Sequence, residues 1–198
     1  MRAVPAALED HDGAVGSTPV LLAVDGGASK TDVVLVAADG TLLGRARGPA
    51  SNHQMVGMEA MIENLSATVA QALVGPGGSS APIVPLGVYC LAGVDLPVDE
   101  ERVGGAVRAA GWTERCDVRN DAFAVLRAGA TGPSGVGVVC GTGLNCVGVG
   151  PDGTHVRFPS LGELSGDFTP GGAWLGVRAL GLALRAQATV GHREPLAL

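Results

Sequence analysis

Two short glycine-rich loops constrain the fold of this chain more than any other feature. The first loop, residues 25–31 (DGGASKT), follows the apolar run 20–24. The second loop, residues 141–143 (GTG), follows the apolar run 136–140. Each loop leads into another strand-like run, which predicts two β-hairpins. Because glycine lets backbone N–H groups approach an anion closely, we expect two halves of the chain to clasp one polyphosphate between these loops.

An acidic residue, Asp25, opens the first loop. A carboxylate repels phosphate unless a cation lies between them, so Asp25 predicts a divalent cation such as Mg²⁺. The chain contains no GxxxxGK[ST] motif. Together these features favour ATP chemistry on a scaffold other than a P-loop. The structural alternative is that Asp25 caps the backbone of its own turn.

Composition narrows the class of protein. The 198 residues are 46% apolar and only 3% aromatic, which suits one large or two small domains with a core of Val, Leu and Ala. A net charge of −6 without a basic run argues against a nucleic-acid surface. No apolar run approaches the roughly 20 residues of a membrane span, and the first residues lack the apolar segment of a signal peptide. We therefore expect a cytoplasmic protein with no membrane partner.

Four cysteines fit this expectation, because none lies in a CxxC pair. We expect reduced thiols, with Cys90 and Cys140 buried within strands.

Hydrophobic periodicity predicts an α/β fold with a mixed sheet covered on both sides. A βββαβαβα order is followed by the opening of the same plan, which indicates internal duplication. Strands are expected at 20–25, 32–37, 41–47, 83–91, 117–120, 136–140, 145–150 and 155–158, and helices at 56–74, 99–110, 121–129 and 171–190. We expect a disordered tail at 1–18, a complete first lobe at 19–133 and an incomplete second lobe at 134–198.

The chain resembles the BadF/BadG/BcrA/BcrD ATPase and N-acetylglucosamine kinase family of the actin-like ATPase and sugar kinase superfamily. Five segments within residues 20–190 carry the resemblance, in the family's order: AVDGGASKTDVVLV, ASNHQ, LAGVDLP, the pair Asn120-Asp121, and VVCGTGLNCVGVGPDG. The resemblance implies a ribonuclease-H-like fold with ATP and Mg²⁺ as cofactors. It also implies phosphorylation of a small-molecule sugar, with N-acetylglucosamine or a related hexosamine as the first expected acceptor.

The resemblance further implies roles for particular residues. Asp25 is expected beside the metal, and Asp121 as the general base that takes the proton of the sugar hydroxyl. Phosphate contacts are expected from Gly26, Gly27, Ser29, Lys30, Thr31, Gly141, Thr142 and Gly143. Sugar contacts are expected from Asn52, His53, Asn120, Asn145 and Asp167, where amides suit hydroxyl groups because they both donate and accept.

Each assignment has a structural alternative. Lys30 can be a solvated lysine at a strand edge, Asp121 a helix N-cap, and Asn52 or Asn145 a turn residue. The run 148–153 matches GxGxxG, but its Pro-Asp-Gly reads as a hairpin turn and no helix follows, so a dinucleotide site is not expected.

The chain departs from the family pattern at two places. Leu144 stands where the family motif GTGSN has serine, and FTPGG follows Asp167 where many of the sugar kinases have Glu-Gly-Ser. Both departures fall near the expected phosphate or acceptor site, so the identity of the sugar stays open.

Two other functions stay open as well. An ATPase that activates an iron–sulfur dehydratase or reductase would place cysteines at a subunit interface. A non-catalytic sugar- or nucleotide-binding remnant or regulator is favoured by the incomplete second lobe, because the family takes its adenosine pocket mostly from that lobe. An incomplete lobe would also leave an apolar edge exposed, and a homodimer is then a candidate assembly.

Overall fold

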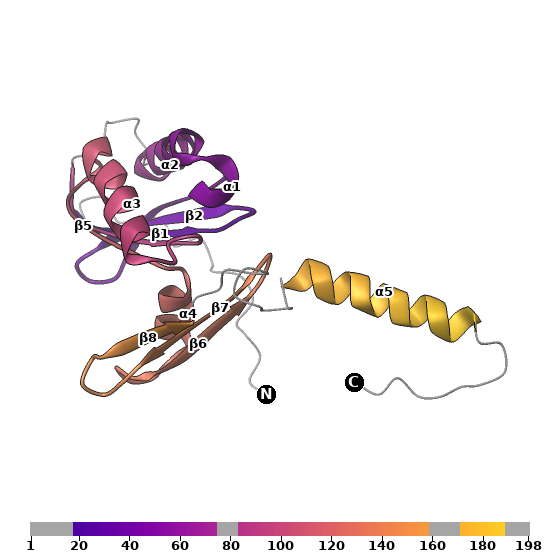
Figure 1. Ribbon diagram of the computed structural model, residues 1–198. Coiled ribbons are helices and arrows are strands. Elements are labelled where there is room, and N and C mark those ends of the chain that lie inside the picture. Colours follow the sequence, from indigo (N-terminus) through magenta and orange to yellow (C-terminus); the bar gives the residue numbers. More distant parts are fainter. Residues whose placement is uncertain (1–17, 75–82, 159–170, 189–198) are drawn as a thin grey trace. The chain divides into compact units, whose positions relative to one another are not determined.

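A computed structural model describes residues 18–74, 83–158 and 171–188 (Figure 1). The chain divides into two compact units, the first ending at Asp121 and the second beginning at Ala122. This division lies before the boundary expected at 133, because helix α4 (Ala122–Gly129) packs on strands of the second unit. Apart from Thr18, the expected tail lies outside the described residues.

The first unit is built on a five-stranded mixed sheet. Its strands are β1 (Pro19–Gly26), β2 (Thr31–Ala37), β3 (Leu42–Gly48), β4 (Val84–Leu91) and β5 (Thr113–Arg119). Their order in the sheet is β3-β2-β1-β4-β5. The β1–β2 and β2–β3 pairs are antiparallel, whereas the β1–β4 and β4–β5 pairs are parallel. Strands β1, β3, β4 and β5 therefore all end at one edge of the sheet.

Three helices cover one face of this sheet (Figure 1): α1 (His53–Val56), α2 (Met58–Leu73) and α3 (Pro97–Ala110). The predicted helix at 56–74 begins earlier and is broken, because Gly57 takes a φ of 85° between α1 and α2. Its core positions are confirmed, since Met61, Leu65 and Val69 are at most 1% exposed.

Alternation along the strands explains why one face is covered. Leu22 and Val24 of β1 pack in the core with α2 and α3. The residues between them point to the opposite face, which becomes charged near the strand ends with Asp25, Asp32 and Arg47. The described helices of this unit all lie on the apolar face, so the expected covering of both faces is not found within the unit.

The second unit repeats the opening of the first. Strands β6 (Gly135–Cys140), β7 (Leu144–Val149) and β8 (His155–Phe158) form an antiparallel sheet in that order. Phe123 and Leu126 of α4 and Val147 of β7 form its small core. Helix α5 (Gly172–Ala188) follows. The three-strand meander matches β1-β2-β3, as the expected duplication requires.

Two sequence predictions about this unit have clear outcomes. The GxGxxG run is a hairpin turn between antiparallel β7 and β8, in which the Gly150 N–H donates to the Thr154 carbonyl at 2.7 Å. Cys140 is exposed, so its predicted burial is wrong, whereas Cys90 is buried as predicted. Alternation places Cys140 on the same face of β6 as Val136 and Val138, which are 70% and 53% exposed.

Within the described ranges, no helix is both long enough and apolar enough to cross a membrane.

We expect the substitution Gly44→Ala to destabilise the first unit. Gly44 lies on β3 beneath α2, and an added Cβ would overlap the Ala72 carbonyl oxygen of that helix. Moving a helix away from its sheet costs about 1–3 kcal/mol. Urea unfolding followed by circular dichroism measures this difference.

Gly105→Ala is the matched control, because an added Cβ on this α3 residue meets no atom within 4 Å. Removing a helical glycine should raise stability by about 0.5–1 kcal/mol. Equal stability of Gly44→Ala and the unaltered chain would contradict the tight packing of α2 on β3.

Candidate functional site

The carboxyl edge of the first sheet brings together most of the residues predicted from the sequence. Asp25 lies near the end of β1, Asn52 and His53 follow β3, and Asn120 and Asp121 follow β5. Strand β4 lies between β1 and β5 in the sheet, so the loop that follows β4 begins at the same edge. Ligands of open α/β sheets bind outside the carboxyl ends of the strands, so this edge is the candidate site.

The first glycine loop is held by its neighbours through backbone hydrogen bonds. Gly27 N–H donates to the Lys30 carbonyl at 2.8 Å and closes the hairpin. Ser51 N–H donates to the Gly27 carbonyl at 3.0 Å, and Ala92 N–H to the Gly26 carbonyl at 2.7 Å. A Cβ on Gly26 would overlap the Ser51 hydroxyl, so close packing requires glycine here. The loop is thus anchored to the segments that follow β3 and β4.

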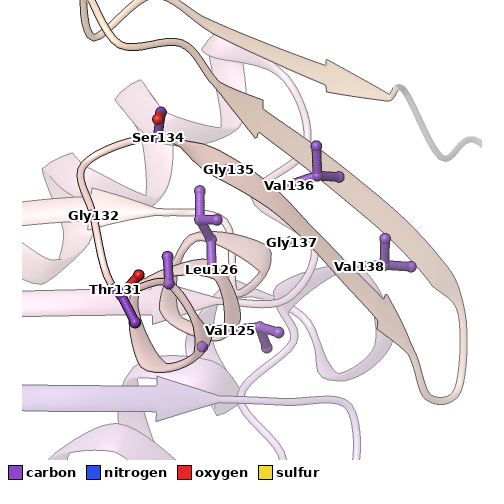
Figure 2. A pocket seen from close by; sticks show the side chains of 11 residues that line it. Val125, Leu126, Thr131, Gly132, Ser134, Gly135, Val136, Gly137 and Val138 are labelled. Atoms are coloured by element: carbon purple, nitrogen blue, oxygen red, sulfur yellow. The ribbon is translucent and has the colours of Figure 1, made fainter.

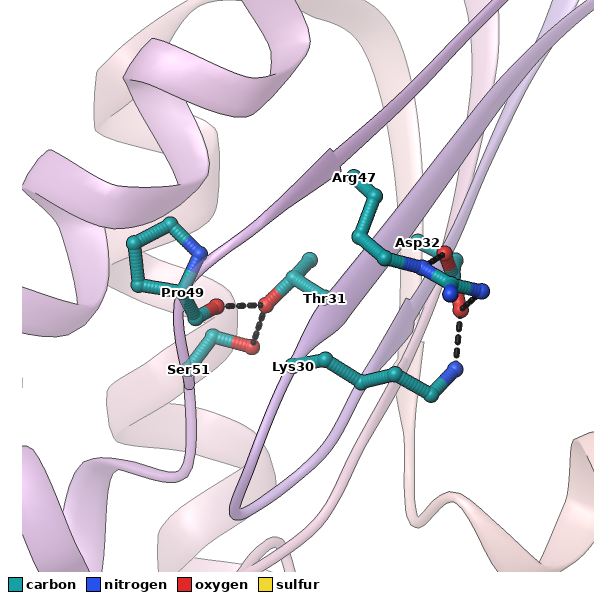
Figure 3. A network of polar contacts seen from close by, with 6 residues as sticks. All are labelled: Lys30, Thr31, Asp32, Arg47, Pro49 and Ser51. Carbon is teal, nitrogen blue, oxygen red and sulfur yellow. Dashed lines mark hydrogen bonds and ion pairs between the residues drawn. The ribbon is translucent and has the colours of Figure 1, made fainter.

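Thr31 supports this loop from the covered face of the sheet (Figure 3). Its fully buried side chain donates to the Pro49 carbonyl at 2.7 Å and lies 2.8 Å from the Ser51 hydroxyl oxygen. The hydroxyl is therefore engaged with the segment after β3, and its contact with phosphate stays a prediction. Ser29 lies exposed in the same hairpin.

A charged network lies on the uncovered face, and two of its three members were missed from the sequence. Asp32 accepts hydrogen bonds from Lys30 Nζ and from Arg47, whose Nε and Nη2 lie at 2.5 and 3.1 Å (Figure 3). The Arg47 hydrogen bond is the main reason that the pKa of Asp32 is lowered. Lys30 is thus ion-paired in this structure. The sequence signal for Asp32 is a carboxylate inside an apolar strand.

Asp25 has a different electrostatic environment, although it lies directly opposite Asp32 in the β1–β2 register. Burial raises the pKa of Asp25, and Asp32 raises it further, while the positive charge of Lys30 lowers it. The residue is nonetheless exposed to solvent, which screens its charge. Asp25 is therefore an accessible carboxylate with a raised pKa, and a nearby cation would lower that pKa.

Cys90 lies on the strand between β1, which carries Asp25, and β5, which leads to Asp121. This thiol lies in register with Asp25 on the neighbouring strand β4. Burial, and next the charge of Asp25, raise the pKa of Cys90 to about 11, and the charge of Asp121 adds to the effect. Two candidate carboxylates thus act on one buried thiol, and Asp121 itself is half-buried.

Asn52 and His53 begin helix α1. The Asn52 side chain caps this helix by accepting from Gln54 N–H at 2.9 Å, whereas its structural alternative was a turn residue. His53 Nε2 lies 3.6 Å from Asp99 Oδ1, and both side chains are nearly buried. The other ring nitrogen of His53 is buried without a partner among the described residues. This inward orientation favours a structural role, and the sugar contacts of both residues stay predictions.

Asn120 belongs to a network that the sequence did not reveal. Its side chain is fully buried, and Nδ2 donates to Asp95 Oδ1 at 2.9 Å. Gln54 Nε2 donates to Asp95 Oδ2 at 3.1 Å and to the Gly93 carbonyl at 2.9 Å. Asp95 and Gln54 stand in LAGVDLP and ASNHQ, two of the segments that carry the family resemblance. Their place in those segments was the available signal.

The second unit holds the remaining described candidates. The loop of Gly141, Thr142 and Gly143 is exposed. Gly141 N–H donates to the Gly143 carbonyl at 2.9 Å, and Gly172 N–H at the start of α5 donates to the Gly141 carbonyl at 2.7 Å. Asn145 Oδ1 accepts from Cys146 N–H at 2.8 Å. Asp167 lies outside the described residues, and the clasping of one polyphosphate by both loops stays a prediction.

A hollow of about 460 Å³ also lies in the second unit (Figure 2). It is lined by α4, the loop that follows, and β6, with Leu126, Val136 and Val138 among its side chains. Its lining contains no ionisable side chain and none of the predicted site residues. The sheet edge of the first unit, which carries the predicted carboxylates and amides, therefore stays the candidate site.

Comparisons with known proteins show what this chain is similar to. N-acetyl-D-glucosamine kinase of Dictyostelium discoideum is 30% identical over an alignment of 188 residues, and the alignment covers 91% of this chain and 59% of that protein. N-acetylmuramic acid/N-acetylglucosamine kinase of Clostridium acetobutylicum is 29% identical over 84% of this chain and 54% of its own length. A crystal structure from Chromobacterium violaceum, assigned as an N-acetylglucosamine kinase, aligns with a TM-score of 0.63 and 27% identity. That alignment covers 90% of this chain and 61% of the other.

The chain spans a little more than half the length of these relatives. The model of the BadF/BadG/BcrA/BcrD ATPase family matches residues 22–195, which include every candidate residue described above. This chain therefore belongs to the BadF/BadG/BcrA/BcrD ATPase family.

Proposed function

We propose that the protein uses ATP and Mg²⁺ to phosphorylate a hydroxyl of N-acetylglucosamine or a related hexosamine. The observation that carries the proposal is the carboxyl edge of the first sheet. There Asp25 lies in register with Cys90 of β4, Cys90 lies in register with Arg119 of β5, and Asp121 follows that strand. The amides of Asn52 and Asn120 follow the two outer strands, β3 and β5. Family membership and the sugar kinases among the relatives support it.

The residues around the first hairpin fit a metal-bound nucleotide. Mg²⁺ is usually held by one or two carboxylates together with phosphate oxygens. Asp25 offers a carboxylate that is partly desolvated yet open to solvent, and Lys30 offers an ammonium group beside it. When bound, the cation would neutralise charge on the phosphates. Asp32 holds Lys30 on the face that carries Asp25, so the positive charge stays beside the hairpin.

Asp121 is proposed to accept the proton of the sugar hydroxyl as the oxygen attacks phosphorus. Phosphoryl transfer demands little covalent chemistry from the protein, so a positioned base and fixed donors are its main contributions. Asp121 directly follows the fully buried Asn120, and this anchors the backbone that carries the carboxylate.

A non-catalytic sugar- or nucleotide-binding protein is the second candidate. The candidate groups at the sheet edge all lie in the first unit, whereas Asn145 lies in the second, and a binding role for them needs no transfer of phosphate. The iron–sulfur alternative has less support. It requires cysteines at a subunit interface, but Cys90 is buried although Cys140 is exposed, and no group of three metal-ligating side chains is found among the described residues.

Location and assembly are proposals too. A cytoplasmic location is supported by the four cysteines, which are all unpaired. Self-association of two copies is supported by the uncovered face of β6–β8, where Val136, Val138, Val156 and Phe158 are 41–71% exposed.

The kinase proposal predicts sugar-dependent release of ADP from ATP and Mg²⁺. N-acetylglucosamine, glucosamine and glucose are compared as acceptors in a coupled assay. Asp121→Asn keeps the shape of the side chain but removes the base, so turnover should fall at least about 100-fold. Asp39→Asn is the control, because Asp39 lies exposed in the β2–β3 turn.

Sugar binding without turnover in the unaltered chain would favour the binding protein over the kinase. Turnover that survives in Asp121→Asn would overturn the role of Asp121.

Asp25→Asn should stabilise the unliganded chain at pH 7 while weakening its binding of ATP with Mg²⁺. The pKa of Asp25 is raised in the folded state, so its ionised form costs stability at neutral pH. Because Asp25 is exposed, solvent screens much of this cost, so the gain in Tm should be small, and it should vanish as the pH falls through the raised pKa and Asp25 becomes protonated.

Asp32→Asn is the matched control, and it should lower the stability of the chain at pH 7. Because the pKa of Asp32 is lowered, its stabilisation is present at pH 7 and is lost as the pH falls below about 3.8. A lower Tm for Asp25→Asn at pH 7 would contradict the desolvation of Asp25.

Self-association should weaken when the uncovered face of β6–β8 becomes polar. Val136 and Val156 both pair with Gly148 and so lie on one face. The double variant Val136→Ser/Val156→Ser should shift the sedimentation coefficient towards that of a monomer. Val98→Ser, at an exposed α3 residue, should leave it unchanged. A chain that is monomeric at all concentrations would exclude the homodimer.

A further inference from the structure

One carboxylate joins two distant segments of the candidate site, and no role has yet been given to it. Asp95 lies in the loop between β4 and α3. Its Oδ2 accepts from Gln54, which belongs to α1 after β3, and its Oδ1 accepts from Asn120, which follows β5. Strands β3 and β5 are the two outer strands of the sheet. A single side chain therefore bridges segments that the sheet itself holds apart.

The backbone around Asp95 is fixed as well. Asp99 Oδ2 accepts from Leu96 N–H at 2.9 Å and from Asp95 N–H at 3.3 Å at the start of α3. Gly93 has a φ of 86°, and an added Cβ there would overlap the Asn52 amide oxygen. The loop thus packs directly against Asn52 and also receives a hydrogen bond from Gln54. The backbone of Asp95 is therefore fixed by its own loop and by Asp99, independently of the two amides.

The chemistry of these contacts is directional. An ionised carboxylate only accepts hydrogen bonds, so the NH₂ group of each amide, and not its oxygen, must face Asp95. Hydrogen bonds to a charged acceptor are also stronger than those between neutral groups. Asp95 therefore sets the orientation of Gln54 and Asn120 at the same time.

We propose that Asp95 is a positioning residue that couples the sugar-contacting loop after β3 to the strand end that carries Asp121. This inference rests on the proposed function, because it assumes that Asn52 and Asp121 face the sugar. Asp95 acts through Gln54 and Asn120, so that the acceptor hydroxyl and the base are aligned by one carboxylate.

The test compares Asp95→Ala, Asp95→Asn and Gln54→Ala with the unaltered chain. Calorimetry measures the Kd of N-acetylglucosamine and, separately, the Kd of ATP with Mg²⁺. Asp95→Ala should raise the sugar Kd at least tenfold and leave the nucleotide Kd within twofold. Asp95→Asn retains one acceptor oxygen, so its sugar Kd should lie between those of Asp95→Ala and the unaltered chain. Glu101→Gln, at an exposed α3 residue, is the control and should change neither Kd.

Coupling through Asp95 is tested by the double variant Asp95→Ala/Gln54→Ala. If Gln54 acts through Asp95, the double variant binds sugar no more weakly than Asp95→Ala alone. Additive losses would overturn the coupling. So would equal losses of sugar and nucleotide affinity in Asp95→Ala, because a general structural defect weakens both.

NMR of the sugar-free chain separates this inference from the proposed function. In Gln54→Ala, the chemical shifts of the Asn120 side-chain amide and of the Asp121 backbone N–H should change. Gln54 follows β3, whereas Asn120 and Asp121 follow β5, the outer strand at the opposite end of the sheet. Gln54 is exposed, so this variant should fold even if Asp95→Ala does not. If the unaltered chain binds no sugar, the proposed function fails for this chain, whereas the shift still decides the coupling. Unmoved Asn120 and Asp121 resonances would overturn it.

Discussion

The parallel pairing of β4 between β1 and β5 is the interaction on which the candidate site depends. Its register places Cys90 beside Asp25 on one side and beside Arg119 on the other. It also makes the loops after β1, β4 and β5 leave the sheet at one edge. A slip of one residue would turn Asp25 towards the apolar core under α2 and α3, so the buried face of the sheet fixes the geometry of the site.

The two carboxylates on the first hairpin show how this geometry divides their roles. Asp25 and Asp32 are cross-strand partners on the same face. Asp32 is compensated by Arg47 and Lys30, and its pKa is lowered. Asp25 carries the cost of desolvation, and its pKa is raised. One carboxylate is thus ion-paired within the fold, while the other stays accessible to solvent with a raised pKa. Such a local conflict with stability is expected where a site has been built for a ligand.

Local patterns in the sequence were sufficient for most of the fold. Strand alternation, turn glycines and the helical spacing of Met61, Leu65 and Val69 predicted elements whose bounds mostly agree within a few residues. The errors arose where tertiary context decides. Cys140 lies in an apolar strand, but only one face of its sheet is covered by α4. The division between the units depends on which sheet α4 contacts, and no local pattern in its sequence specifies that choice.

The same distinction applies to the candidate site. Asp25 and Asp121 were identified because each stands at a strand end within a recognisable motif. Asp32, Arg47, Gln54 and Asp95 were missed because their contacts join residues 15 to 41 positions apart. These four share one property, since each contacts a predicted residue or its neighbour and restrains it.

The departures from the family pattern lie in a different part of the chain from the polar groups that are described at the sheet edge. Leu144 belongs to the second unit and the FTPGG run follows residue 167, whereas Asn52, Gln54, Asp95, Asn120 and Asp121 all belong to the first unit. The polar groups described at this edge are therefore held by one sheet, whereas Asn145, another predicted sugar contact, lies beside Leu144 in the second unit. The departure at Leu144 thus stands next to one predicted contact, while the hydrogen bonds that join Gln54, Asp95 and Asn120 do not involve it.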